Sequence, residues 1–291
     1  MTYPDPIKLA IPVFMFLIVI EMIVAKKTGW LRYETRDMTT SLMMGFGNSL
    51  IGLLAVGLIF TAYSWAYQFR LFDLAPVWWV FIACFLAEDL AYYWFHRISH
   101  KHRWFWASHV VHHSSQHYNL STALRQTWTG KLTGSFIFWL PLCLLGFPPE
   151  MVLFFNGVSL VYQFWIHTEA IGRLGPLEWV LNTPSHHRVH HGTNPRYLDA
   201  NYAGVLIIWD RLFGSFVAED PAEPVRYGII KNPSTFNPLR IAFHEWIGIG
   251  KDLRHATNVR EYLGYLWGPP GWSPDGSRMT SVMIKARAAK L

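Results

Sequence analysis

The sequence predicts an all-α integral membrane protein in which about four to five membrane helices carry a cytosolic helical cap with a histidine-rich dimetal site. Three observations support this fold class. Hydrophobic residues make up 52% of the 291 residues and charged residues only 15%, whereas soluble domains carry about 25%. Apolar runs long enough to cross a bilayer recur. Seven of the 14 histidines fall between His96 and His117. Because no linker or repeat divides the chain, we expect residues 1–291 to form a single domain.

Five apolar stretches are the predicted membrane segments. They are residues 7–25, 40–64, 76–95, 131–147 and 149–166. We expect the first to be a membrane anchor rather than a cleaved signal peptide, because Lys8 is the only basic residue at its start and no small-residue cleavage site precedes Lys26. The last two segments are joined by the turn GFPP and are predicted to form a hairpin. The sequence leaves open whether both cross the membrane fully.

The loops between these segments predict the orientation of the protein. Four basic residues lie between the first two segments: Lys26, Lys27, Arg32 and Arg36. Only Arg70 lies between the second and third, so the positive-inside rule places the first loop in the cytoplasm. The third and fifth segments then also end in the cytoplasm. We therefore predict a cytosolic metal-binding cap made of residues 96–130 and 167–250, followed by a tail, 251–291, that ends in a loop and basic residues.

Charge and cysteine content narrow the possible classes. The net charge is +6, but the basic residues are spread along the chain, so we expect no nucleic-acid partner and attribute the charge to a face against anionic lipid. Cys84 and Cys143 lie inside apolar runs and form no CxxC pair. They therefore predict neither a disulfide framework nor a thiolate metal site. The oligomeric state is left open.

Three histidine motifs point to metal binding. They are HxxxH at His96 and His100, HxxHH at His109, His112 and His113, and a second HxxHH at His187, His190 and His191. On a helix, residues three and four apart share a face, so each motif aims imidazoles in one direction. Imidazole is a good ligand for iron, zinc, copper or nickel. Eight such ligands exceed what one four-coordinate ion needs, so we predict two metals, with His167 as a ninth ligand.

Polar residues near the motifs are candidates for a second shell. Glu88 and Asp89 lie inside the apolar third segment, where an ionised group is costly and needs a partner. We expect one of them to accept a hydrogen bond from a metal-bound imidazole, the alternative being an arginine partner elsewhere. Gln163, one turn before His167, is a candidate weak ligand or water-holder. The remaining candidates for the second shell are His186 and His117. We expect His244 and His255 to be ordinary surface residues.

These motifs resemble those of the fatty acid hydroxylase / sterol desaturase superfamily of membrane di-iron enzymes, which shows HxxxH, HxxHH and HxxHH in this order. Flanking stretches such as WASHVVHHSSQHYNLSTALRQTW and NYAGVLIIWDRLFGSF are most similar to its alkylglycerol monooxygenase branch. The resemblance covers about Arg32 to Glu219. It implies a non-haem di-iron site that activates O₂ and hydroxylates a C–H bond of a lipid. In that branch the substrate is an ether lipid.

The resemblance also implies cofactors and substrate contacts. Two iron ions and O₂ are expected, although zinc could replace iron in purified material. The reductant must be external, tetrahydrobiopterin or a ferredoxin-type donor, because the chain has no haem or iron–sulfur motif. Candidate residues for a head group or pterin are Asn119, Thr122, Arg125, Tyr202 and Asp210. Trp106 and Trp165 are candidates to line a substrate tunnel, the alternative being an interfacial aromatic belt.

Other readings of the sequence remain. Hydroxylases and desaturases of the same superfamily that act on sterols, carotenoids or aminolipids share this ligand set. A zinc hydrolase is disfavoured because the chain has no HExxH motif. A metal transporter is disfavoured because transporters place their ligands near the bilayer midplane, whereas these histidines are predicted on one cytoplasmic face.

Overall fold

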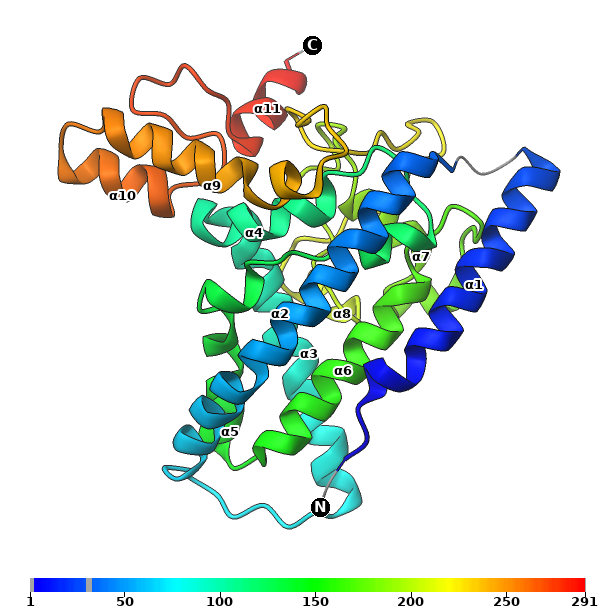
Figure 1. Cartoon of the computed structure of the whole chain (residues 1–291), viewed down its shortest axis with the longest axis vertical. Helices are drawn as coiled ribbons and strands as arrows, with labels where there is room; N and C mark the ends of the chain where they lie inside the picture. Colours follow the sequence, from blue (N-terminus) through cyan, green and yellow to red (C-terminus); the bar gives the residue numbers. More distant parts are fainter. Residues whose placement is uncertain (1–2, 30–32, 291) are drawn as a thin grey trace.

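The computed structural model describes residues 3–29 and 33–290, and helices joined by loops make up this part of the chain (Figure 1). Within these ranges, pairing between extended segments is limited to two isolated bridges, Leu181 with Leu206 and Gly192 with Tyr227. The predicted all-α class is therefore confirmed. Arg32, one of the basic residues used to orient the chain, lies outside the described residues.

Two helices are long and apolar enough to cross a membrane, α1 (Pro6–Thr28) and α2 (Thr35–Tyr67). The Asp5 carboxylate begins α1 by accepting hydrogen bonds from two backbone N–H groups, and Gly29 ends it at a φ of 65°. Large apolar side chains stay uncovered on both helices: Phe16 is 63% exposed and Leu54 81%. Such contiguous apolar faces are rare on soluble monomers and fit contact with lipid.

Helices α3 (Trp78–Lys101) and α6 (Pro149–Trp165) complete the bundle. Helix α6 packs against α1, α2 and α3, and Figure 1 shows it in green between α1 and α3. Cys84 and Met151 are fully buried where α3 and α6 contribute to the largest apolar core. The third and fifth predicted segments are thus helices, and their crossing of the membrane stays a prediction.

The fourth predicted segment, residues 131–147, is not one helix. It consists of three short pieces, η2 (Gly130–Leu132), η3 (Ser135–Trp139) and α5 (Leu140–Leu145). Gly134 separates the first two with a φ of 82°, a conformation that a helix cannot contain. Pro141 starts α5 and has no N–H to continue the hydrogen-bond ladder of the preceding residues.

The remaining helices are α4 (Arg103–His113), η1 (Leu120–Leu124), η4 (Gly175–Trp179), α7 (Pro184–His190), α8 (Ile208–Leu212), α9 (Pro238–His255), α10 (Val259–Trp267) and α11 (Ser281–Ala288). Figure 1 shows α9, α10 and α11 at one end of the bundle. The predicted tail, residues 251–291, contains the end of α9, all of α10, a loop from residue 268 to residue 280 and the short helix α11. Arg278 anchors this region through its guanidinium, which lies 2.5 Å from Asp252 Oδ1.

Candidate metal centre

All nine predicted histidines come together in two groups. The first group is His96, His100, His109, His113 and His190, and the second is His112, His167, His187 and His191. Within each group, one ring nitrogen of every histidine lies within 4.8 Å of the others. This arrangement could hold a metal ion in each group, and the role of the individual histidines as ligands stays a prediction.

Each HxxHH motif contributes to both groups. On α4, His109 and His113 are four residues apart and belong to the first group, whereas His112 points to the second. On α7, His187 belongs to the second group and His190 to the first. His191, the residue after α7, belongs to the second group. Neighbouring residues on a helix diverge by about 100°. Each HxxHH motif therefore supplies histidines to two adjacent groups rather than to one.

The ring nitrogens are spaced as ligands of a common ion are spaced. His96 Nε2 lies 2.9 Å from His109 Nε2. In the second group, His167 Nε2 lies 3.0 Å from both His112 Nε2 and His187 Nε2. Two nitrogens bound at about 2.1 Å to one metal, at right angles, are about 3.0 Å apart.

Backbone carbonyls orient three of these imidazoles. His96 Nδ1 donates to the Tyr202 carbonyl at 2.7 Å, and His167 Nδ1 donates to the Gln163 carbonyl at 2.7 Å. His190 Nδ1 lies 2.9 Å from the carbonyl of residue 200. Each of these bonds places the ring proton on Nδ1 and leaves the Nε2 lone pair free for a metal. His100 Nε2 is buried and has no hydrogen-bond partner in the described part of the chain, as expected of a ligand atom.

Burial keeps these imidazoles neutral. It lowers the pKa of His109 to about 3, with a further lowering from His190 nearby. It lowers the pKa of His190 itself to about 4, against the opposing effect of its backbone hydrogen bond. Neutral imidazole is the form that binds a metal, so the groups are ready for ions at neutral pH.

The sequence predicted that a carboxylate of α3 would contact a histidine, but neither of the two does. Asp89 accepts the backbone N–H groups of Val205 and Leu206 at 2.8 and 3.0 Å and the indole N–H of Trp209 at 2.9 Å. Glu88 Oε1 accepts hydrogen bonds from the side chains of two other residues, Trp139 and Asn156. The predicted hydrogen bond from a metal imidazole to either carboxylate is therefore wrong, and main-chain carbonyls take that place.

Asp210, on α8, fixes the loop residue Tyr202, whose carbonyl orients His96 of the first group. Asp210 accepts the backbone N–H groups of Tyr202 and Ala203, both at 2.8 Å. Because the Tyr202 carbonyl holds His96, Asp210 acts on the metal centre through the backbone and not on a substrate as predicted. The Tyr202 ring lies 5.3 Å from the His100 ring, and its buried hydroxyl has no partner among the described residues.

The three residues predicted to bind a head group after the second motif are structural. Arg125 is buried, and its guanidinium lies 3.1 Å from Asp37 Oδ1 on α2. Asn119 and Thr122 form a reciprocal capping box that begins η1. These contacts fix the chain just after α4, which is the helix that carries three of the histidines.

Four further predicted residues have mixed outcomes. The Gln163 side chain donates to Ser159 at 3.1 Å, so only its backbone carbonyl serves the centre. Trp165 packs at the interface of α6 and α1. His117 is half-buried and lies outside both histidine groups. Trp106 is beside the first group, with its ring 5.0 Å from the His100 ring.

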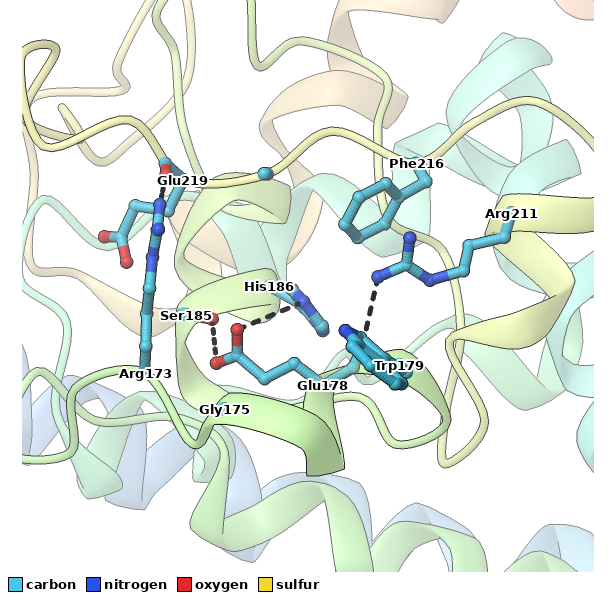
Figure 2. Close-up of a pocket in the computed structure, with 10 residues that line it drawn as sticks. Arg173, Gly175, Glu178, Trp179, Ser185, His186, Arg211, Phe216 and Glu219 are labelled. Carbon is cyan, nitrogen blue, oxygen red and sulfur yellow. Dashed lines mark hydrogen bonds and ion pairs between the residues drawn. The ribbon is translucent and has the colours of Figure 1, made fainter.

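His186 faces away from the metal groups, contrary to the second-shell prediction. It lines a separate cavity of about 190 Å³, where its Nε2 lies 3.9 Å from Glu178 Oε2 (Figure 2). Ser185 donates to the other oxygen of that carboxylate at 2.7 Å. Burial lowers the pKa of His186 to about 4, although Glu178 opposes the shift.

Sequence reasoning missed two supports of the second group. Tyr118 lies over the His167 ring with centroids 5.8 Å apart and donates to the Ile166 carbonyl at 3.0 Å. Arg188 forms a two-pronged ion pair with Glu219 and donates to the carbonyls of residues 168 and 171. The position of Arg188 inside the second HxxHH motif was a signal that could have suggested this role.

A second, larger cavity of about 680 Å³ reaches the first group from the cap side. Its floor includes His100, His113 and Trp106. Its walls come from α4, α9, α11 and the loop at residues 228–232. His244, which the sequence suggested to be an ordinary surface residue, lines this cavity, and its buried Nε2 has no partner among the described residues.

Comparison with known proteins supports the predicted class. Residues 81–215 match the fatty acid hydroxylase family. The chain is similar to the alkylglycerol monooxygenase of Homo sapiens, with 42% identity over 95% of this chain and 62% of the relative. It is 40% identical to that of Danio rerio over 96% of this chain and 62% of the relative. The predicted resemblance is confirmed.

The name of a more distant relative indicates another lipid substrate for that protein. The ornithine lipid hydroxylase OlsE of Rhizobium tropici is 31% identical over 47% of this chain and 40% of its own length. The chain spans about three-fifths of the alkylglycerol monooxygenases it matches. No solved structure matches it significantly. These relatives and the two apolar helices indicate a membrane protein.

Proposed function

We propose that the protein is a membrane di-iron monooxygenase that uses O₂ and an external reductant to hydroxylate a C–H bond of a lipid. The observation that carries this proposal is the pair of adjacent, buried groups of five and four histidines. The similarity to alkylglycerol monooxygenases makes an ether lipid the first candidate substrate. The proposed topology is multi-pass, with the centre at the cytoplasmic end of the bundle.

The residues present fit two iron ions. Nine neutral imidazoles would hold them, and imidazole-rich sites suit iron. Bound iron would supply the activation of O₂ and the oxidation of the lipid C–H bond. The chain's own residues hold three of the nine rings in place through backbone carbonyls. They also keep bulk water out, since all but one of the nine are buried.

The proposal is tested by metal analysis and product analysis on the same preparation. We expect two irons per chain in protein purified without chelator. We also expect oxidation of an alkylglycerol at the carbon beside the ether oxygen, which yields a hemiacetal that collapses to an aldehyde and glycerol. Hydroxylation of an ornithine lipid or a sterol instead would keep the class and change the substrate. A single zinc that iron cannot replace, without oxidation of any lipid, would contradict the proposal.

The cap cavity is the proposed entry for the reductant. Its walls come from α4, α9, α11 and the loops beside them, and of α3 only His100, one residue before the end of that helix, contributes. A soluble molecule could therefore reach the first group without passing through the lipid-facing bundle. The volume of about 680 Å³ lies in the range of small-molecule sites. The half-buried Trp106 ring offers a stacking surface at the floor, and His244 Nε2 offers a free acceptor in the wall.

Replacing His244 by alanine is expected to raise the KM for a small soluble reductant by about 3- to 10-fold, the effect of one lost hydrogen bond. The KM for the lipid and the metal content should stay unchanged. Steady-state kinetics with each reactant varied in turn measures both values. The control is His255→Ala, an exposed residue on the same helix. Equal effects on both KM values, or none, would argue against this route.

A further inference from the structure

Helices α9 and α10 pack against each other and extend sideways beyond the bundle (Figure 1). Each is amphipathic. On α9, Ile241 and Ile249 are buried, while Leu239 is 60% exposed on another face. On α10, Leu263 is 53% exposed and Trp267 46%. This pair of helices, residues 238–267, is called the lateral hairpin below.

The side of the lateral hairpin that carries its tryptophans is turned towards the bundle. The Trp104 ring lies 5.0 Å from Trp246 on α9 and 6.2 Å from Trp267 on α10. Trp104 Nε1 in turn donates to the Thr133 carbonyl at 3.0 Å. Thr133 belongs to the broken apolar segment that runs down the bundle towards α5. The hairpin is therefore linked through Trp104 to the start of that apolar segment.

The apolar surface of α2 continues onto α9. Thr40 Oγ1 donates to the Phe236 carbonyl at 2.9 Å, so α9 begins beside the cap-side end of α2. Trp128 bridges the two helices, because its indole N–H donates to the Met44 carbonyl and its ring lies 6.5 Å from Phe243. The uncovered face of one long apolar helix thus leads to the exposed face of the hairpin. Tryptophans at such a boundary are typical of the membrane interface.

The unpaired charge of the hairpin is net positive. Of its three carboxylates, Glu245 and Asp252 are neutralised by Arg103, and the second also by Arg278. The third, Glu261, accepts hydrogen bonds from Thr257 and Asn258 and forms no ion pair within the described residues. Four exposed cations form no ion pair within the described part of the chain: Arg240, Lys251, Arg254 and Arg260. Such a surplus favours binding to anionic head groups at a charged bilayer surface.

From this arrangement we propose that the lateral hairpin lies on the surface of the bilayer that holds the bundle. Its apolar face enters the head-group region, and its cations contact anionic lipid phosphates. Amphipathic helices with apolar and aromatic residues on one face and basic residues beside it bind membranes in this way. The surface is separate from the metal groups, so the inference does not depend on the proposed function.

Lipid-borne quenchers test the proposal on the full chain in nanodiscs. Leu263→Cys places a fluorophore on the exposed face of α10, and Ser277→Cys places one in the loop that joins α10 to α11, which lies on the far side of the hairpin (Figure 1). The native Cys84 and Cys143 are buried and do not compete for label. We expect quenching by lipids spin-labelled near the head group to be severalfold stronger at position 263 than at 277.

The lipid composition tests the electrostatic part. Addition of phosphatidylglycerol to phosphatidylcholine nanodiscs should increase quenching at position 263, and the variant with Arg254→Ser and Arg260→Ser should lose that increase. Both changes are on the exposed surface, and an unchanged melting temperature shows that the fold is kept. Equal quenching at positions 263 and 277 would overturn the proposal. So would protection of position 263 by a second copy of the chain, detected as a doubled particle mass.

Discussion

Replacing His113 by alanine is expected to abolish lipid oxidation and to empty the first metal group. His113 Nε2 lies 3.1 Å from His109 Nε2 and 3.2 Å from His190 Nε2, so the ring completes that group. Loss of residues that merely orient a ligand costs about 10- to 100-fold in metal affinity or activity. Loss of a ligand itself should therefore reduce kcat/KM by at least about 100-fold. Metal content per chain and product formation, measured together, check this.

A matched comparison separates the ligand role from general damage. His255→Ala removes an exposed imidazole from α9 and should leave metal content and activity intact. His112→Ala should empty the second group and leave iron bound to the first. Retention of full activity in two or more variants of the nine histidines would refute the ligand assignment.

Arg125→Ala is expected to destabilise the protein by about 3–5 kcal/mol, because it leaves the Asp37 carboxylate buried without its cation. The pair ties the chain after α4 to α2, and Arg125 also donates to Ser114 and Ser41. Thermal or denaturant unfolding in detergent measures the change. If Arg125 instead bound a lipid head group, the variant would keep its stability and show a raised KM for the lipid.

The double variant Arg125→Met with Asp37→Leu is the control for this interpretation. It removes both charges and keeps apolar volume, so it should recover much of the stability that Arg125→Ala loses. A double variant as unstable as the single one would assign the effect to the lost serine contacts rather than to the ion pair.

The histidine sites could be predicted from sequence because helical periodicity is local. The spacing of His109, His112 and His113 fixes their relative directions once the segment is helical. The spacing did not indicate that His112 belongs to the second group, because that depends on where α7 lies. Apolar composition likewise predicted α1 and α2, but it could not show that Gly134 breaks the fourth segment.

The carboxylates could not be placed from sequence because their partners are distant main-chain groups. Asp89 accepts hydrogen bonds from the backbone at residues 205 and 206, and the composition of neither segment predicts this contact. From sequence alone, a buried carboxylate near a histidine motif could equally accept a hydrogen bond from a metal-bound imidazole or from backbone N–H groups. The same holds for Asp210, and for His244, whose cavity exists only once α9, α11 and α4 come together.

The use of main-chain carbonyls to orient His96, His167 and His190 has a consequence for variation of the protein. A carbonyl cannot be deleted by a point mutation, whereas a carboxylate acceptor can. Side chains at the positions that supply these carbonyls, such as Ala200 and Gln163, can therefore be exchanged without loss of the acceptor, provided that the backbone keeps its path. Mutational robustness of the centre thus depends on the path of the backbone, which Asp89 and Asp210 fix by accepting hydrogen bonds from the backbone at residues 202, 203, 205 and 206.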